Sequence, residues 1–144
     1  MKPRHAVAPA MVAVLAACAA DPPTPPGGEA GLAGTSWRLV KFVGGDDTTR
    51  IPEDPSRYIL DFESDGKVSV RVDCNRGTAR WQSSGPGQLQ LGPLALTRAM
   101  CPRGSLHDLL VRQWPHVRSY VIRDAHLHLS LIADGGTFEF EPLK

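Results

Sequence analysis

Apolar and polar residues alternate along most of the chain after residue 32. Val68, Val70 and Val72, for example, alternate with polar or charged side chains. This period of two is typical of a β-strand with one buried face and one solvent-facing face. The run from Trp37 to Val43 is apolar on both faces apart from Arg38 and Lys41, as expected of an interior strand. The pattern predicts strands over residues 37–43, 58–62, 68–72, 89–91, 127–131 and 138–140, with weaker candidates at 78–82 and 119–123.

Short turn-forming sequences connect neighbouring strands in this pattern. Residues 64–66 (Ser-Asp-Gly), 123–125 (Arg-Asp-Ala) and 134–136 (Asp-Gly-Gly) each separate two alternating rows. Glycine, such as Gly66, can supply the positive φ that tight hairpin turns require. Short antiparallel strands joined by such hairpins predict a sheet that curls or closes on itself.

One segment has a helical period instead. Within residues 105–114 the apolar side chains fall on one helical face: Leu106, Leu109, Leu110 and Trp114. Ser105 stands at the position of an N-cap, and Asp108 would complete an approximate capping box. Pro115 predicts the end of the helix or a kink. We therefore expect a β-rich α+β fold with one compact domain, in which a single amphipathic helix covers one open end of a curled or barrel-like antiparallel sheet.

The amino terminus has the features of a secretory signal peptide. Lys2 and Arg4 give a basic start, and residues 6–17 are apolar apart from Pro9. A helix over this stretch would be about 18 Å long, which is too short for the roughly 30 Å hydrocarbon core of a membrane. A basic start, a short apolar stretch and small residues at its end predict a signal peptide over residues 1–17.

Residues 15–18, Leu-Ala-Ala-Cys, resemble the lipobox of bacterial lipoproteins. The resemblance implies that the signal peptide is cleaved before Cys18 and that Cys18 is lipidated. An ordinary signal peptide, cleaved near Ala17 or Ala20, is the alternative.

A linker rich in proline and glycine follows Cys18. Residues 21–31 contain four prolines and three glycines, which can propagate neither a helix nor a sheet ladder. Extended, this stretch would span about 30 Å, so residues 18–31 are expected to tether the domain to the membrane. Ala19 follows the cysteine where some lipoproteins have aspartate. By the sorting pattern of well-studied Gram-negative bacteria, this implies a cell-envelope protein anchored in the outer membrane and facing the periplasm.

The charge balance argues against one large class of functions. The chain has 16 Lys and Arg residues against 15 Asp and Glu residues, a net charge of +1. Nucleic-acid binding requires a clear basic excess, so we expect no nucleic-acid partner. The length suits one folded domain, which we place at residues 32–144 and expect to be a monomer.

Cys74 and Cys101 are the two cysteines that remain after Cys18. In an exported protein, an even pair favours a disulfide. A metal site, a nucleophilic cysteine and free thiols are the alternatives. A metal site would need at least three ligands, and neither cysteine stands in a C-x-x-C or C-x-x-H array.

Several stretches of the chain resemble a known family when they are taken in order. They are residues 32–39 (Leu-Ala-Gly-Thr-Ser-Trp-Arg-Leu), the hairpin at 60–68, Cys-Asn-Arg at 74–76, and residues 94–102, which end in Met-Cys-Pro. Over about residues 32–142 the chain is similar to the META domain (HslJ-like) family. The resemblance implies a compact β-rich periplasmic or surface domain without an established catalytic reaction. Where the family usually has a glycine before the cysteine at 74, this chain has Asp73.

A disulfide between the two cysteines would gather one polar cluster. It would bring Thr97 and Arg98 close to Asn75 and Arg76, and this cluster is our candidate binding patch. The alternative is a structural corner, because an asparagine beside a bridged cysteine can hold a turn through hydrogen bonds to the backbone.

Other candidate chemistry is sparse. His126 and His128 share the exposed face of a predicted strand, but no third metal ligand is evident, so they are interpreted as surface residues. His107 and His116 are expected to be solvated. No phosphate-binding glycine loop, nucleophile elbow or zinc-protease motif occurs. We therefore expect no enzymatic activity, no metal and no cofactor.

These features predict a noncatalytic envelope lipoprotein whose domain is a binding module. The family resemblance implies a connection with stress or antibiotic tolerance, and an inhibitor of lysozyme or of a protease is a specific version. A small-ligand carrier, with an apolar cavity inside the curled sheet, is the alternative. We expect Trp37, Trp81 and Trp114 to fill that interior.

Overall fold

The structure is a computed structural model that describes Pro3 and residues 31–143. The predicted signal peptide apart from Pro3, the lipidation site Cys18, and the tether apart from Gly31 lie outside the described residues. None of the helices within the described part is long and apolar enough to cross a membrane.

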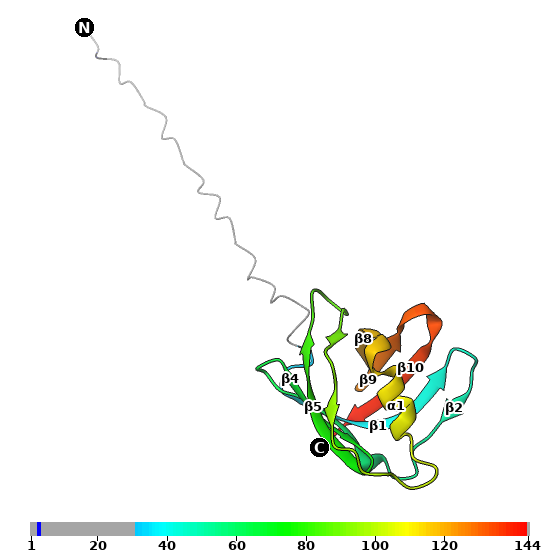
Figure 1. Cartoon of the computed structure of the whole chain (residues 1–144). Coiled ribbons are helices and arrows are strands. Elements are labelled where there is room, and N and C mark those ends of the chain that lie inside the picture. The colour runs from blue at the N-terminus through cyan, green and yellow to red at the C-terminus, as the bar shows by residue number, and fades with distance from the viewer. Residues whose placement is uncertain (1–2, 4–30, 144) are drawn as a thin grey trace.

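An antiparallel sheet forms the body of the domain (Figure 1). Its strands run in the order β6-β5-β4-β3-β1-β10-β9-β8, while β2 pairs with β1 and β7 pairs with β5. The strands are β1 (Thr35–Gly44), β2 (Thr49–Arg50), β3 (Tyr58–Phe62), β4 (Lys67–Val72), β5 (Asn75–Gln82), β6 (Gln90–Leu91), β7 (Ala95–Leu96), β8 (Val117–Arg123), β9 (His126–Leu131) and β10 (Gly136–Pro142). The helices are α1 (His107–Gln113) and the 3-10 turns η1 (Pro55–Arg57), η2 (Trp114–His116) and η3 (Ile132–Asp134).

The two ends of the strand order approach each other, so the sheet curls into a nearly closed barrel. The backbone N–H of Leu89 donates to the carbonyl oxygen of Arg118 at 3.0 Å. The N–H of Tyr120 donates to the carbonyl oxygen of Gly87 at 2.9 Å. These bonds join the segment that leads into β6 to β8. The β-rich α+β prediction, with a curled or barrel-like sheet, is confirmed.

The alternating rows form strands because each row buries one face. Buried and partly exposed residues alternate without exception along β4 and β9. In β1 a β-bulge lies between Leu39 and Lys41, so Leu39 and Phe42, three residues apart, are both buried. This bulge explains why residues 37–43 show no simple alternation. The row at 89–91 is shorter than predicted, because the Leu89 N–H bonds to Arg118 of β8 rather than to β5.

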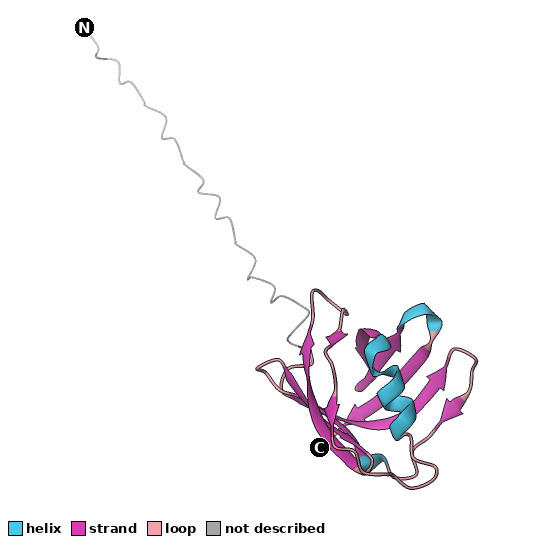
Figure 2. Ribbon diagram, in the orientation of Figure 1, coloured by secondary structure: helices cyan, strands magenta, loops and turns pink. Residues whose placement is uncertain are grey.

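The single amphipathic helix lies across the open side of the curled sheet (Figure 2). Its residue Leu110 and the following Trp114 are buried, and the Trp114 indole N–H donates to the carbonyl oxygen of Gly92 at 2.9 Å. The space between this helix and the sheet measures only about 10 Å³. That volume is about what one water molecule needs, so this interior does not favour the ligand-carrier alternative.

The start of the helix differs from the prediction. The helix begins at His107 rather than Ser105, and its cap residue, Leu106, makes no side-chain capping bond. The Ser105 hydroxyl does accept a hydrogen bond from the His107 N–H at 3.1 Å. Asp108 instead shares a hydrogen bond of 2.9 Å with the His107 ring Nδ1. The predicted capping box is therefore wrong, because the carboxylate of Asp108 is turned toward a neighbouring side chain and not back to the backbone.

Candidate functional site

Cys74 and Cys101 form a disulfide, with their Cα atoms 5.4 Å apart. The bond joins the start of β5 to the end of the segment of residues 94–101. The prediction of a disulfide is confirmed, and it fixes the loop that precedes the helix against the sheet.

The side chain of Asn75 clamps the same segment. Its Oδ1 accepts hydrogen bonds from the Thr97 hydroxyl at 2.8 Å and from the Ala99 N–H at 2.7 Å. Its Nδ2 donates to the carbonyl oxygen of Ala99 at 2.9 Å. Asn75 is fully buried. Because its polar atoms are already used within the protein, it acts as a structural clamp and not as a contact for a ligand.

The other three residues of the candidate patch lie around this clamp. The Thr97 hydroxyl accepts from the Arg76 N–H at 3.1 Å, and the Thr97 N–H donates to the Arg76 carbonyl oxygen at 3.0 Å. The side chains of Arg76 and Arg98 are exposed. The structure therefore brings all four predicted residues together, but it assigns Asn75 and Thr97 to a structural corner.

Asp73 stands where the family usually has a glycine, directly before Cys74, and its conformation explains how an aspartate fits there. Its φ is +56°, in the left-handed region that favours glycine but that aspartate also adopts. Its carboxylate forms an ion pair with Arg57, and its N–H donates to the Arg57 carbonyl oxygen at 2.7 Å. The ion pair compensates the burial of the carboxylate, so the corner keeps its geometry.

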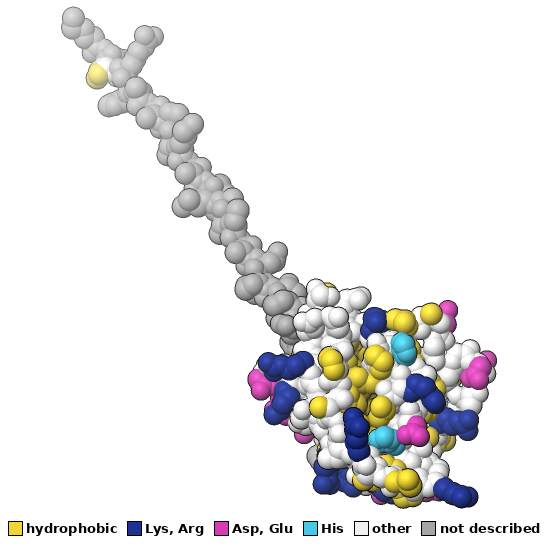
Figure 3. Space-filling model, viewed as in Figure 1, with side chains coloured by type: hydrophobic (Ala, Val, Ile, Leu, Met, Phe, Trp, Pro, Cys, Tyr) yellow, Lys and Arg dark blue, Asp and Glu magenta, His cyan; other side chains and the backbone are white. Residues whose placement is uncertain are grey.

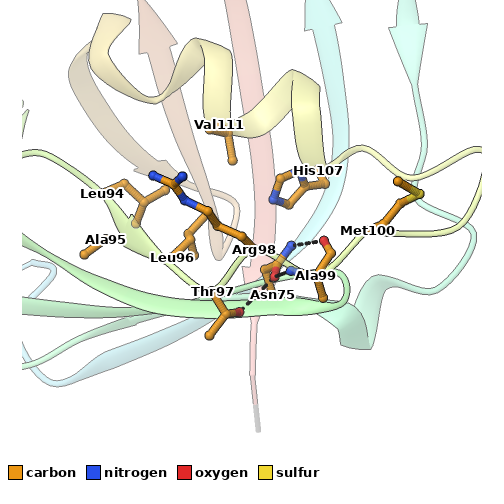
Figure 4. A pocket seen from close by; sticks show the side chains of 10 residues that line it. All are labelled: Asn75, Leu94, Ala95, Leu96, Thr97, Arg98, Ala99, Met100, His107 and Val111. Carbon is orange, nitrogen blue, oxygen red and sulfur yellow. Dashed lines mark hydrogen bonds between the residues drawn. The ribbon is translucent and has the colours of Figure 1, made fainter.

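A groove of about 680 Å³ lies between the segment of residues 94–100 and α1 (Figure 4). Leu94 and Leu96 come from the segment and Val111 comes from the helix. In the space-filling view, apolar side chains gather near the centre of this face, with basic side chains around them (Figure 3). Met100 stands at the rim and is 98% exposed, which is unusual for a large apolar side chain.

Two cationic or titratable side chains project into the groove, Arg98 and His107 (Figure 4). The prediction that His107 is solvated is wrong, since its side chain is only 21% exposed. Its Nε2 is buried without a hydrogen-bond partner among the described residues. The sequence pattern could have indicated this position, because residue 107 lies three residues before Leu110 and four before Val111 and so shares their face of the helix.

His126, in β9, is engaged elsewhere. His126 Nδ1 lies 2.7 Å from Glu139 Oε1, and Lys41 Nζ lies 3.2 Å from Glu139 Oε2. The hydrogen bond from His126, and then that from Lys41, holds the pKa of Glu139 below its usual range. Within residues 31–143, no group of three or more His, Cys, Asp or Glu side chains is placed to hold a metal ion.

The geometry of the groove suits an apolar ligand that carries one acidic group. Its walls are mainly aliphatic, its one permanent charge is the Arg98 guanidinium, and none of its lining residues is a carboxylate. Such a surface can bind and orient a partner. The sequence alone did not indicate this groove, because Val111 and Leu94 lie far apart in the chain.

Comparisons with known proteins agree with this fold. The family model described as the META domain matches residues 30–144. No curated protein matches the chain. The NMR structure of a protein from Burkholderia xenovorans is 25% identical, covers 99% of each chain and has a TM-score of 0.67. The crystal structure of a DUF4847 family protein from Bacteroides vulgatus is 14% identical, covers 78% of this chain and 95% of its own, and shares the fold with a TM-score of 0.58.

Proposed function

The chain belongs to the META domain family, and on that premise we propose that it is a noncatalytic, lipid-anchored binding module of the cell envelope. Its lipid sits on Cys18, its domain faces the periplasm from the outer membrane, and its groove between residues 94–100 and α1 binds an envelope component. Binding matters under heat, envelope or antibiotic stress.

The groove is the observation that carries the binding role. It combines a volume of about 680 Å³ with an aliphatic lining and an almost fully exposed Met100 at the rim. Exposed apolar side chains that gather in one hollow mark interaction sites more often than scattered ones do. The disulfide and the Asn75 clamp hold one wall of this hollow in place, so a partner meets a preorganised surface.

The anchor is supported by residues 15–18 and by the linker that follows. Leu-Ala-Ala-Cys resembles a lipobox, and the proline- and glycine-rich residues 21–31 suit a tether. Membrane fractionation tests this part directly. The wild-type protein is expected in the detergent-soluble membrane fraction and Cys18→Ala in the soluble fraction. Ala19→Ser, a change at the next position, serves as the matched control and is expected to remain in the membrane.

Site-specific crosslinking in the cell tests the binding role. A photoreactive amino acid at position 100, on the rim of the groove, is expected to capture a discrete partner. The same amino acid at position 51 is the control, because Ile51 is also exposed, at 69%, but does not line the groove. Equal capture from both positions, or none from position 100 under heat, detergent and antibiotic challenge, would contradict the proposal. The identity of the captured protein also shows whether the partner is a lysozyme or a protease.

A further inference from the structure

The strand β7 has one open edge. It pairs antiparallel with β5, and among the described residues it pairs with no other strand. The N–H of Thr97 donates to Arg76 at 3.0 Å, so Thr97 belongs to a hydrogen-bonded pair with β5. Because backbone groups alternate in direction along an antiparallel strand, those of Leu96 and Arg98 point away from β5. A short row of outward N–H and C=O groups therefore borders the segment.

This open edge runs beside the groove. At one end the Trp114 indole N–H, in η2 directly after the helix, donates to the carbonyl oxygen of Gly92, just before the segment. At the other end the disulfide holds Cys101 to the start of β5. Residues 94–98 between these two fixed points span about 16 Å when extended. The groove therefore offers an edge the length of a short strand, with the helix residue Val111 facing it.

The edge is held rigid on its inner side. Gly77 lies so close to β7 that a Cβ atom there would overlap the carbonyl oxygen of Ala95. The Asn75 side chain fixes Thr97 and Ala99 through three hydrogen bonds. An edge that is already extended loses little conformational entropy when another strand pairs with it.

The charges in the groove select among possible occupants. Arg98 is its permanent charge, the buried Nε2 of His107 lacks a partner among the described residues, and none of the lining residues is acidic. A second copy of this chain that paired through the same edge would bring another Arg98 into the groove, and like charges across paired strands are unfavourable. An extended segment with an acidic residue supplies both the missing backbone partners and the missing charge.

We propose that the groove binds an extended acidic segment of a partner protein, which adds as a strand to the outer edge of β7 and pairs its carboxylate with Arg98. This inference rests on the proposed binding function and names the chemical class of its partner. Main-chain hydrogen bonds to Leu96 and Arg98 give affinity, while the aliphatic walls and the guanidinium give specificity, as in other cases of strand addition.

Selection from a phage-displayed library of random octapeptides on the purified protein tests the proposal. The enriched peptides are expected to share an Asp or Glu at one position and to lack proline at alternating positions, because those N–H groups must donate. A selected peptide is then added to isotope-labelled protein. The NMR signals of the Leu96 and Arg98 amides are expected to shift. These amides are also expected to exchange their hydrogens at least about tenfold more slowly.

Two charge reversals test whether peptide binding depends on the groove or only on the net charge of the protein. Arg98→Glu is expected to weaken binding of the selected peptide at least about tenfold. Arg123→Glu makes the same change of charge at the last residue of β8 and is expected to leave binding unchanged. Both arginines are exposed, so both variants are expected to keep the melting temperature of the wild type, which confirms that they fold.

Several results would overturn strand addition. The selection could enrich no peptide, the enriched peptide could leave the Leu96 and Arg98 amides unchanged, or both charge reversals could weaken binding equally. A dimer that buries the β7 edge, or an acyl chain retained by the protein in native mass spectrometry, would also overturn it. Crosslinking from position 100 keeps the two proposals apart. If that crosslink persists while peptide selection fails, the binding function stands and the extended acidic segment is wrong.

Discussion

Replacing Asn75 by alanine tests whether its side chain is the clamp that holds the groove wall. The change removes three hydrogen bonds, one from the Thr97 hydroxyl and two with the backbone of Ala99, together with two weaker ones from Nδ2 to the disulfide sulfur atoms. Each is worth about 0.5–1.5 kcal/mol net. Because Thr97 and Ala99 are themselves exposed, water can replace part of this loss. We therefore expect Asn75→Ala to lower the free energy of unfolding by about 2–3 kcal/mol.

Urea unfolding of the oxidised protein, followed by tryptophan fluorescence, measures this loss. Asn75→Asp keeps both acceptor functions but loses the donor to Ala99 and places a charge at a fully buried position, so it is expected to be no more stable than Asn75→Ala. Thr78→Ala, at an exposed position on the same strand, is the control and should change stability by less than about 0.5 kcal/mol. A loss for Asn75→Ala as small as that of the control, or a fully stable Asn75→Asp, would refute the clamp.

Three further predictions concern the same domain. Replacing Cys74 and Cys101 together by serine is expected to lower the free energy of unfolding by about 3–4 kcal/mol, since the disulfide closes a long loop; a loss below about 1 kcal/mol in urea would contradict this. Gly77→Ala would push a Cβ into the Ala95 carbonyl and is expected to destabilise the protein by about 1–3 kcal/mol, with faster hydrogen exchange in β7 as the specific sign. The pKa of Glu139 is lowered by its histidine and then its lysine partner, so its carboxylate stabilises the fold above pH 4.5 and this contribution is lost as the pH falls through the lowered pKa. Stability curves of the wild type and Glu139→Gln should therefore converge on acidification, and a constant gap between them would contradict the assignment.

The strands could be predicted from the sequence because burial imposes the alternation directly. Rows such as 68–72 and 127–131 have one face in the core, so a shift by one residue would expose that entire face. β2 and β7 were not predicted, because strands of two residues are too short to show a period. Their positions depend on partners elsewhere in the chain, such as Gly77 for β7.

The candidate site could be predicted only in part for a similar reason. The disulfide followed from the cysteine count, and it placed Thr97 and Arg98 beside Asn75. The roles of these residues followed from geometry that no local pattern encodes. Asn75 is buried and fully hydrogen-bonded, whereas Arg98 faces the groove. His107, expected in solvent, is mostly covered because it shares a helix face with Leu110 and Val111 and lines the groove.

The segment of residues 94–101 is restrained by more contacts than its small buried area would lead one to expect. Ala95, Thr97, Arg98 and Met100 are exposed, so the segment contributes little apolar area to the core through them. A chain with so little buried surface would ordinarily be mobile. Here a disulfide, a buried amide and a close approach to a glycine all restrain it. Restraints of this kind are retained where the exposed side of a segment must keep one shape, which is the property that a binding edge needs before its partner arrives.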